Sequence, residues 1–430
     1  MIRRPPRSTQ SRSSAASDVY KRQHLVTEAT SGKNTHMTHI EDRVIYGGVN
    51  GARESILALR AMRDMLAGSA KKSVNVTVKW DGAPAVFAGI DPTDKKFFVA
   101  KKGIFNKNPK VYKSHADIDE DTSGDLSVKL KVAFDELSKI GITGVIQGDL
   151  MFTEKDLKPE TIDGVNYITF HPNTIVYAVR TDSMEAKYIR KARIGIIVHT
   201  SYSGDSFENM RASFGVKASS FKKAPSVWLQ DANLRDLSGT ATLTKADTDE
   251  VTKALSEAGK IFNKIKGNAL NDLSKNEEMA GLIETYNNSF VRRGEKITNT
   301  AKHVQGLIKW IEERFQKEAD KVKTPAAKDR KMAKRDELLK FFSTSNKANL
   351  KSIFDLQNAI VVAKLVIINK LNKVNSIDTF IKTKSGYTVT GAEGFVAIDK
   401  LKGGAVKLVD RMTFSFNNFS SDVIKGWQKS

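Results

Sequence analysis

The segment VNVTVKWDG occupies residues 74–82 and carries the clearest structural signal of the chain. Apolar and polar side chains alternate along it, which is the period of a β-strand with one buried face. On such a strand Val76 and Val78 face the core, and Lys79 lies on the opposite face at the strand end. The next residues, 81–84 (DGAP), predict a turn. Taken alone, KWDG fits either a lysine that faces a cleft or an ordinary exposed lysine before a turn.

The sequence on either side of this segment predicts a mixture of helices and strands. Residues 51–66 have an apolar stripe at helical spacing with arginines on the other side, and residues 126–140 are also amphipathic. Strands are predicted at residues 85–88, 96–100, 143–152, 174–179 and 194–199. The predicted fold class is therefore α+β.

The composition changes at about residue 245. Glu, Lys, Ala and Leu dominate as far as about residue 375 and helical spacing recurs, which predicts an all-α insertion. The basic run at residues 321–335 contains Pro325 and is expected to be a loop or a helix end. Strand patterns return at residues 387–389, 394–398 and 405–409. The predicted organisation is an N-terminal segment (24–48), the first part of an α+β domain (49–244), the insertion (245–378) and the last strands with the C-terminus (379–430).

Bulk composition restricts the class of protein. A chain of 430 residues with 40% hydrophobic residues is long enough for two or three domains with their own cores. The absence of cysteine excludes disulfides, thiolate zinc sites and cysteine nucleophiles, and fits a reducing compartment. We expect no membrane span, because the best candidate, residues 359–368, is short and contains Lys364. The predicted location is the cytoplasm.

The charge of the chain points to a polyanionic partner. The net charge is +21 and the pI is about 9.7. Lys and Arg bind phosphates by releasing condensed counterions, so nucleic acid is the expected partner. A protein that is simply rich in lysine is the alternative. Five residues of the basic run are candidates for contact with a phosphate backbone, or else form a solvated helical face: Lys328, Arg330, Lys331, Lys334 and Arg335.

Residues 1–23, MIRRPPRSTQSRSSAASDVYKRQ, resemble translated sequencing-adaptor sequence. We therefore leave them out of the fold prediction and expect them to be disordered. They hold six basic residues and one Asp, so the rest of the chain still carries +16. Met37 is the expected start of the natural protein, although residues 24–36 could also belong to it.

Five further motifs follow KWDG along the chain. They are Lys102-Gly103, Gln147-Gly148-Asp149-Leu150, residues 174–179 (TIVYAV), Glu393-Gly394-Phe395-Val396 and Ala405-Val406-Lys407-Leu408. In this order they resemble the motifs of the ATP-dependent nucleic-acid ligase superfamily of covalent nucleotidyltransferases, and the phage-type members in particular. The resemblance covers roughly residues 74–179 and 393–411.

The resemblance implies a two-lobed nucleotidyltransferase domain that joins 5′-phosphate and 3′-hydroxyl ends of RNA or DNA with ATP and Mg²⁺. Lys79 would attack the α-phosphate and become lysyl-AMP, and Lys407 would neutralise charge on the transferring phosphate. An attacking amine must be unprotonated, so we expect a depressed pKa for Lys79, caused by partial burial and by Lys101 or Lys102. Which of these two lysines faces the pocket depends on strand register.

The other implied nucleotide contacts involve acidic, aromatic and glycine residues. Asp149 and Glu393 would bind Mg²⁺ or the ribose hydroxyls, since carboxylates are hard oxygen ligands. Tyr177 would stack on adenine, although ordinary core packing also explains a tyrosine there. The complete set implied to bind the nucleotide is Asp81, Gly82, Lys101, Lys102, Asp149, Tyr177 and Glu393.

The sequence departs from the family pattern at three points. Asp149 stands where the family has glutamate, and Val409 stands where a second lysine is common. Too few residues follow the last motif for a C-terminal OB-fold, which favours an RNA-ligase-like member. The alternative function is a catalytically inactive ligase-fold protein, either nucleic-acid-binding or a phage accessory protein, and a narrower one is nucleotidyl transfer to a protein or small molecule. The histidines, including His39 and His199, are scattered and predict no metal site.

Overall fold

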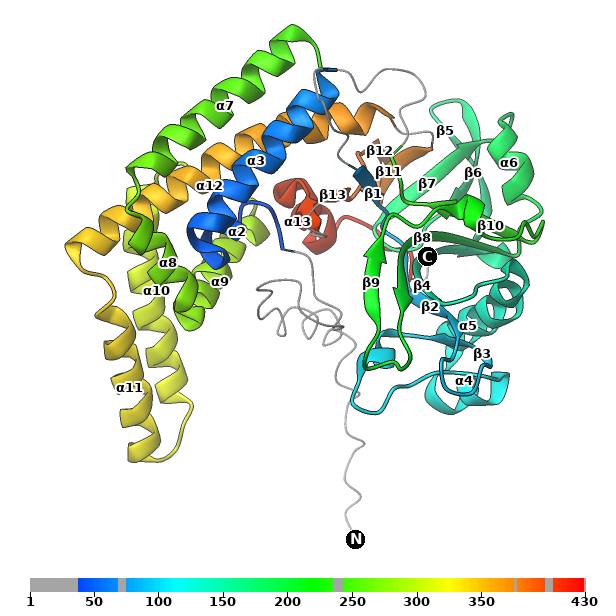
Figure 1. Cartoon of the computed structure of the whole chain (residues 1–430), viewed down its shortest axis with the longest axis horizontal. Helices are drawn as coiled ribbons and strands as arrows, with labels where there is room; N and C mark the ends of the chain where they lie inside the picture. The colour runs from blue at the N-terminus through cyan, green and yellow to red at the C-terminus, as the bar shows by residue number, and fades with distance from the viewer. Residues whose placement is uncertain (1–37, 69–74, 235–242, 375–376, 399–404, 429–430) are drawn as a thin grey trace.

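The structure of the protein is a computed structural model, which describes residues 38–68, 75–234, 243–374, 377–398 and 405–428. Its elements form a helical lobe and a β lobe (Figure 1). Helices and sheets occur together, and the strand pairs within the described sheets are antiparallel except for one parallel pair. The predicted α+β class is therefore confirmed.

The larger sheet of the β lobe has the strand order β10-β8-β4-β2-β3, and β9 pairs with β8. Its members are β2 (Ala85–Ile90), β3 (Phe97–Ala100), β4 (Val145–Thr153), β8 (Ile194–Ser203), β9 (Arg211–Phe214) and β10 (Val227–Asp231). Only the β8–β10 pair is parallel. Two helices, α4 (His115–Asp121) and α5 (Gly124–Leu137), cover one face, where Leu130 and Ala133 join one core with Val86 and Ile146.

A second sheet packs against part of the other face. Its order is β12-β11-β7-β6-β5 and all its pairs are antiparallel. The strands are β5 (Lys158–Ile162), β6 (Val165–Phe170), β7 (Ile175–Arg180), β11 (Asp378–Thr383) and β12 (Gly386–Val389), with helix α6 (Met184–Ile189) after β7. The ring of Phe152 on β4 meets that of Phe170 on β6, with ring centroids 4.9 Å apart. Aromatic packing thus joins the two sheets and leaves the rest of the β4 and β8 face to the pocket.

A three-stranded sheet connects the lobes. Its order is β1-β13-β14, with β1 (Asn75–Lys79), β13 (Gly394–Ile398) and β14 (Ala405–Leu408). Phe395 and Leu408 are buried in the same core as the helices. The register places Thr77 opposite Val396 and Val396 opposite Lys407, so Lys79, two residues after Thr77, shares a face with Lys407. One face of this sheet therefore holds the helical lobe, and the other carries the two lysines.

The helical lobe is larger than the predicted insertion. It consists of α2 (Arg43–Tyr46), α3 (Gly48–Leu66), α7 (Lys245–Lys264), α8 (Gly267–Lys275), α9 (Glu277–Arg293), α10 (Thr300–Asp320), α11 (Pro325–Leu339) and α12 (Thr344–Leu371). Helix α13 (Arg411–Phe419) contacts α9. The apolar stripe of α3, including Ile56, Leu59 and Met62, lies in the core of this lobe. Helix α3, which we assigned to the first part of the α+β domain, and α2, which lies in the predicted N-terminal segment, therefore both belong to the helical lobe.

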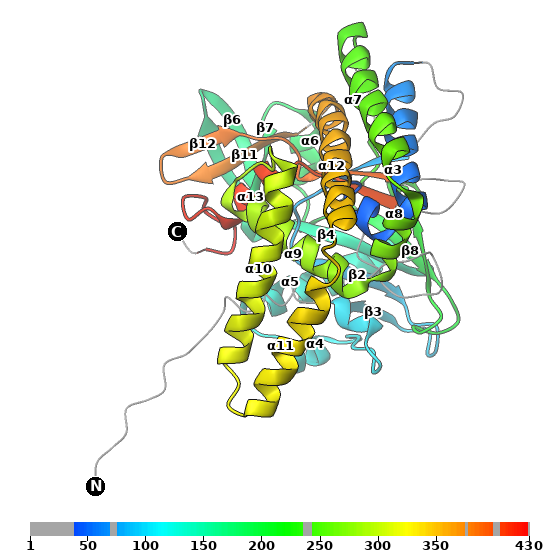
Figure 2. The same ribbon diagram turned by 90° about the vertical axis from the view of Figure 1, so that its left-hand side faces the viewer.

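Helices α10 and α11 form a hairpin that projects from the lobe (Figure 2). The expected loop at residues 321–335 is for the most part helix, because Pro325 occupies the first turn of α11. A proline is tolerated there, since the missing N–H would have no partner inside the helix. Leu338 is the one buried residue of α11.

Helix α12 is longer than the short apolar stretch, residues 359–368, on which the expectation of no membrane span was based. Its 28 residues include a window with a mean hydropathy of 1.4, so by length and composition it could cross a bilayer. Half of that window is buried inside the structure, and Lys364 in the helix pairs with Glu41 at 2.8 Å. A core helix of a soluble protein has these same properties. The packing thus identifies α12 as the core helix of the helical lobe.

Candidate functional site

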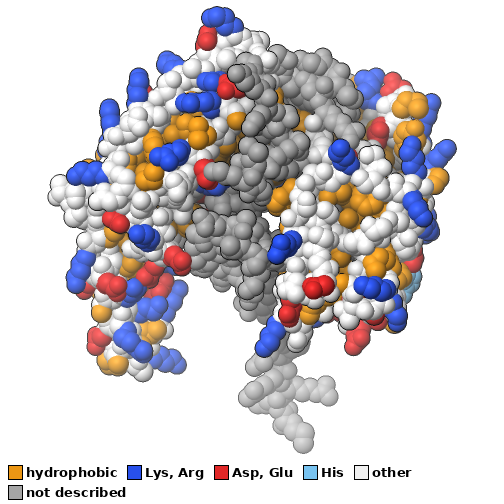
Figure 3. All heavy atoms as spheres, in the orientation of Figure 1, with side chains coloured by type: hydrophobic (Ala, Val, Ile, Leu, Met, Phe, Trp, Pro, Cys, Tyr) orange, Lys and Arg blue, Asp and Glu red, His pale blue; other side chains and the backbone are white. Residues whose placement is uncertain are grey.

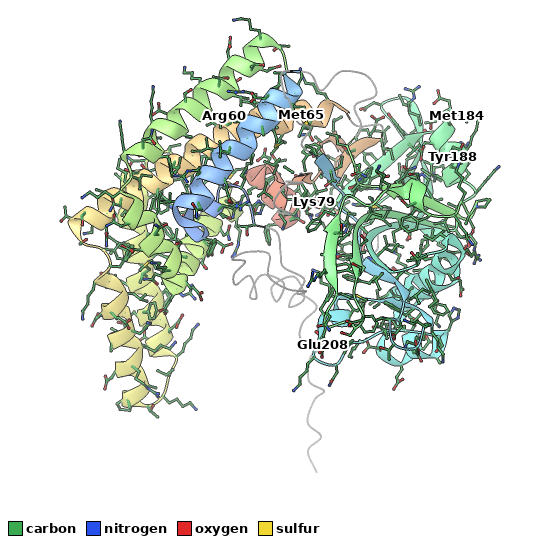
Figure 4. The ribbon with its side chains drawn as sticks, viewed as in Figure 1. Arg60, Met65, Lys79, Met184, Tyr188 and Glu208 are labelled. Carbon is green, nitrogen blue, oxygen red and sulfur yellow. The ribbon has the colours of Figure 1, made fainter. Side chains whose placement is uncertain are left out.

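Lys79 lies at the end of β1, between the two lobes (Figure 4). The β1 register places it opposite Gly394, so Glu393 lies next to its side chain. The Nζ of Lys79 forms an ion pair with Oε1 of Glu393. The Glu393 side chain is 6% exposed and that of Lys79 is 28% exposed. The amine is thus partly exposed, on the face that the alternation along residues 74–82 predicts, and it lies in a cluster of charged side chains around Lys79 and Glu393 that we call the pocket.

The protonation of Lys79 differs from the prediction. Burial lowers its pKa, but the nearby carboxylates of Glu393, Asp149 and Asp81 overcome this, so the pKa of Lys79 ends above its ordinary value. The expected depression of the pKa is therefore wrong for this arrangement. The prediction counted the lysines that follow β3 and left out the effect on the pKa of three carboxylates, of which Glu393 and Asp149 come from distant segments and Asp81 lies two residues away.

The two acidic residues implied for the pocket are both there. Asp149 lies on β4 and Glu393 immediately precedes β13. Burial raises the pKa of each carboxyl group to about 7, although the charge of Lys79 opposes the change. Carboxyl groups with such pKa values exchange protons near neutral pH, which is a frequent property of functional sites.

Lys407 enters the same pocket from β14. Burial, followed by the charge of Lys79, lowers its pKa to about 8. Glu393 acts in the opposite direction, and Lys102 adds to the lowering. The pocket therefore contains two lysines on neighbouring strands of one small sheet, and both interact with the same glutamate.

The structure separates Lys101 from Lys102. Lys101 turns to Asp121 of α4, with 3.2 Å between Nζ and Oδ2. Lys102 begins the short 3-10 helix η1 (Lys102–Phe105), and its charge acts on both Asp149 and Lys407. Lys102 therefore faces the pocket, whereas Lys101, also predicted to bind the nucleotide, points away from it.

Asp81 has a structural role in this arrangement. Its carboxylate accepts hydrogen bonds from Asn173 Nδ2 at 2.6 Å, from the Thr174 amide at 2.7 Å and from the Ile175 amide at 2.9 Å. These bonds tie the turn after Lys79 to the start of β7. The carboxylate is thereby committed to the protein, so Asp81 supports the pocket and does not offer its oxygens to a nucleotide.

Gly82 is required for close packing against β4. A Cβ at this position would lie 2.6 Å from Cβ of Asp149 and 2.9 Å from the carbonyl oxygen of Leu150. Such contacts are too short for any side chain. Gly82 therefore lets the turn approach Asp149, which explains the glycine without a contact to the nucleotide.

Tyr177 is a core residue. Its side chain is 2% exposed and its hydroxyl accepts a hydrogen bond from the Asp81 amide at 2.7 Å. Its ring stacks on Phe170 at 5.4 Å and lies 5.2 Å from the ring of Trp80. A ring that is buried against these aromatic neighbours has no surface exposed for adenine. The implied stacking role is therefore corrected in favour of the core packing that was its alternative.

His199 lies in the pocket and was not assigned a role from the sequence. Its Nε2 is 3.8 Å from Oδ2 of Asp149. Burial and the charge of Lys79 lower the pKa of His199 to about 4, so the ring is neutral. The β4–β8 register shifts at this point, with Gln147 opposite Thr200 and Gly148 opposite Val198. This bulge redirects His199 into the pocket, and no alternating pattern in the sequence reveals a bulge.

The pocket residues and both lobes fall within one sequence family. A profile described as "Family of unknown function (DUF6267)" matches residues 34–423. The chain belongs to this family. No curated protein and no solved structure matches the chain. Family membership therefore leaves the activity open, and the pocket itself must supply the argument.

The donor set of the pocket fits a metal ion that arrives with phosphates. Among the described residues there is no group of three or more His, Cys, Asp or Glu side chains placed to hold a metal ion. Mg²⁺ commonly binds through one or two carboxylates and completes its shell with phosphate oxygens and water. Asp149 and Glu393 fit that mode and would be the residues that hold Mg²⁺.

The five predicted nucleic-acid contacts all lie on α11, in the projecting hairpin. Lys331 pairs with Glu318, Lys334 with Glu278 and Arg335 with Asp336. Figure 3 shows basic and acidic side chains together at this end of the molecule. The structure does not bring these residues into the pocket, and three of the five are engaged in ion pairs within the helical lobe.

Proposed function

We propose that the protein is an ATP-dependent nucleic-acid ligase, RNA-ligase-like in type, which acts through a lysyl-AMP intermediate on Lys79. The observation that carries the proposal is the convergence of Lys79, Asp149, Glu393 and Lys407 in one pocket. These residues come from four separate strands or strand ends, up to the far end of the chain. They are the residues to which the resemblance gives catalytic or metal-binding roles.

The chemistry of the first step follows from these contacts. The Nζ of Lys79 attacks the α-phosphorus of ATP, an N–P bond forms, and the bond from phosphorus to the pyrophosphate oxygen breaks. Nζ must lose a proton before the attack, and its direct partner is Glu393, whose pKa of about 7 suits a proton acceptor at neutral pH. Lys407 stabilises the added negative charge while it remains cationic.

The later steps of the proposed reaction bring the two nucleic-acid ends to the same pocket. AMP passes from Lys79 to a 5′-phosphate, and a 3′-hydroxyl then displaces AMP to form the phosphodiester. Mg²⁺, when bound at Asp149 and at Glu393 while Glu393 is unprotonated, would supply charge neutralisation for the phosphates. Lys102 adds a third cation beside the pocket, which favours polyphosphate binding.

The test is intact-mass spectrometry of the protein after incubation with ATP and MgCl₂. We expect an AMP-sized adduct on the wild type and none on Lys79→Ala. Lys102→Ala should reduce the adduct more than Lys101→Ala, its matched control, because only Lys102 faces the pocket. An adduct that persists in Lys79→Ala would refute the assignment of the nucleophile.

One observation favours the inactive alternative. The raised pKa of Lys79 and its ion pair with Glu393 keep the amine protonated at rest. A nucleic-acid-binding protein with this fold would bind ATP without forming the adduct. Equilibrium binding of a fluorescent ATP analogue, measured beside the mass spectrum, separates the two functions: binding without an adduct supports the inactive protein, and binding with an adduct supports the ligase.

A further inference from the structure

An exposed aromatic surface lies in the C-terminal part of the described chain. Phe416 and Phe419 on α13 are 61% and 55% exposed, and Trp427 is 64% exposed. Every other Phe or Trp in the described part of the chain is less exposed than this. We call these three residues the aromatic platform. Large exposed aromatic side chains are costly in water and commonly mark a binding surface.

The platform is attached to the proposed active site at its N-terminal end. Helix α13 begins four residues after Lys407 of the pocket. Its first residue, Arg411, binds Asp42, with Nη1 at 3.0 Å from each carboxylate oxygen. This end of the helix is therefore fixed relative to β14.

Two contacts attach the rest of the platform to the turn after Lys79. The hydroxyl of Thr174 donates to Oδ1 of Asn418 at 3.0 Å, while the amide of Thr174 donates to Asp81. The amide of Gly426, next to Trp427, donates to the carbonyl of Asn173 at 2.7 Å. The segments that carry the platform are thus tied to the turn after Lys79, and its rings are exposed.

The chemistry of the platform favours single-stranded nucleic acid as its occupant. Phe416 and Phe419 are three residues apart on one helix, so their Cβ atoms are roughly 5–6 Å apart, a spacing that suits neighbouring unpaired bases. Lys407 of the pocket precedes the first residue of α13 by four residues, so a cation lies before the N-terminal end of the helix that carries Phe416 and Phe419. Aromatic faces next to cations, in a chain of net charge +21, match bases next to phosphates.

We propose that Phe416, Phe419 and Trp427 stack on the unpaired bases next to the end that is joined. This inference rests on the proposed ligase function, because it assigns the partner of the same pocket. The terminal phosphate or hydroxyl would reach Lys79 while the adjoining bases lie on the platform. No sequence readout is required, since every base has a stacking face.

The test compares two double variants in the full chain. Phe416→Ala/Phe419→Ala removes the helical part of the platform. Met184→Ala/Tyr188→Ala is the matched control, because these side chains are 61% and 59% exposed on α6, at the far side of the β lobe from Lys79 (Figure 4). Fluorescence anisotropy at fixed salt measures binding of labelled single-stranded RNA, single-stranded DNA and a blunt duplex. Quenching of Trp427 emission on binding is a second readout, interpreted against Trp427→Phe.

We expect the platform variant to bind single strands at least about tenfold more weakly, since one stacked base contributes roughly 1–3 kcal/mol. The control should bind like the wild type. Equal binding by wild type and platform variant, equal loss in the control, or no binding by the wild type would overturn the proposal. Loss of a wild-type dimer in the platform variant, seen as a halved mass by light scattering, would also overturn it, because the surface would then join two copies of this chain.

Self-adenylation of the same proteins separates this inference from the proposed function. The platform variant should still form the AMP adduct, because both phenylalanines lie outside the pocket, and this also verifies its fold. Platform-dependent binding without any wild-type adduct would uphold the platform and refute the ligase. An adduct with platform-independent binding would uphold the ligase and refute the platform.

Discussion

Glu41 and Glu393 are both buried glutamates that contact a lysine, but their pKa values move in opposite directions. Burial raises the pKa of Glu41, yet Lys364 and Arg411 overcome it and leave the value below the ordinary one. For Glu393, burial prevails over Lys79 and the pKa rises to about 7. The difference lies in the neighbours: Glu41 has two cations, at 2.8 Å and 3.6 Å, whereas Glu393 shares Lys79 with Asp149 and Asp81.

The two clusters therefore serve different purposes. The linking network, composed of Glu41, Asp42, Lys364 and Arg411, gives each charged group an oppositely charged partner, and its side chains are 1–15% exposed. Burial still raises the pKa of Asp42, to about 6, which is less than the values of about 7 in the pocket. It joins the segment before α2 to α12 and α13. The pocket contains charges that are not fully compensated and a lysine open to solvent. Charges that are matched in the protein support its architecture, and charges left unmatched are available to a ligand.

The largest expected effect comes from Lys364→Met, which leaves Glu41 without its closest cation. We expect a loss of about 3–5 kcal/mol in the free energy of unfolding, the usual result when one member of a buried ion pair is removed. Urea unfolding measures this loss. Lys79→Met is the control and should change stability by less than about 1 kcal/mol, because carboxyl groups with pKa values near 7 can take up a proton instead. Equal losses in the two variants would remove the distinction between the clusters.

Asp149→Asn, a substitution in the pocket, should raise the free energy of unfolding, whereas Lys364→Met should lower it. The folded-state pKa of Asp149, about 7, lies above its ordinary value of 3.8, so wild-type stability falls as pH rises from about 4 to 7. The variant removes this penalty and should gain about 1–3 kcal/mol above pH 7, with no gain below pH 4. Adenylation should fall by about 100-fold or more if Asp149 acts on the phosphates. Unfolding curves at pH 4 and pH 8 measure the gain, and a uniform loss of stability at both would contradict it.

The smallest effect is expected for Lys407→Met. This variant removes a cation from the pocket, whereas Lys364→Met removes one from the linking network. The pKa of Lys407 is lowered from 10.5 to about 8, so its cationic form weakens the folded state. The variant should gain stability of the order of 1 kcal/mol below pH 8, and the gain should fade as pH rises toward 10.5. Thermal unfolding at pH 7 and pH 10 measures it. Destabilisation at pH 7, as expected for Lys364→Met, would place Lys407 among the structural charges.

Several features of the fold and the pocket were predictable because they depend on local patterns. The valines at 76 and 78 place Lys79 on the opposite face of β1, and Lys407 follows in the same way from its neighbours on β14. Tyr177 is a contrasting case, since alternation puts it on a strand but does not tell whether its ring faces a ligand or Phe170. His199 depends on a bulge between β4 and β8, which is a property of the pairing and of neither strand alone.

The sequence by itself determined the elements with a strong period, the basic character of the chain and the face of β1 that carries Lys79, because each of these resides in neighbouring residues. Tertiary structure decided the protonation of Lys79, since it brings Glu393 and Asp149 from distant segments to the lysine, beside the neighbouring Asp81. It also decided that α3 belongs with the helices of residues 245–371, and that Lys102 and not Lys101 faces the pocket. Electrostatic interactions and core packing act through space, so they are determined jointly by residues that are far apart in the chain.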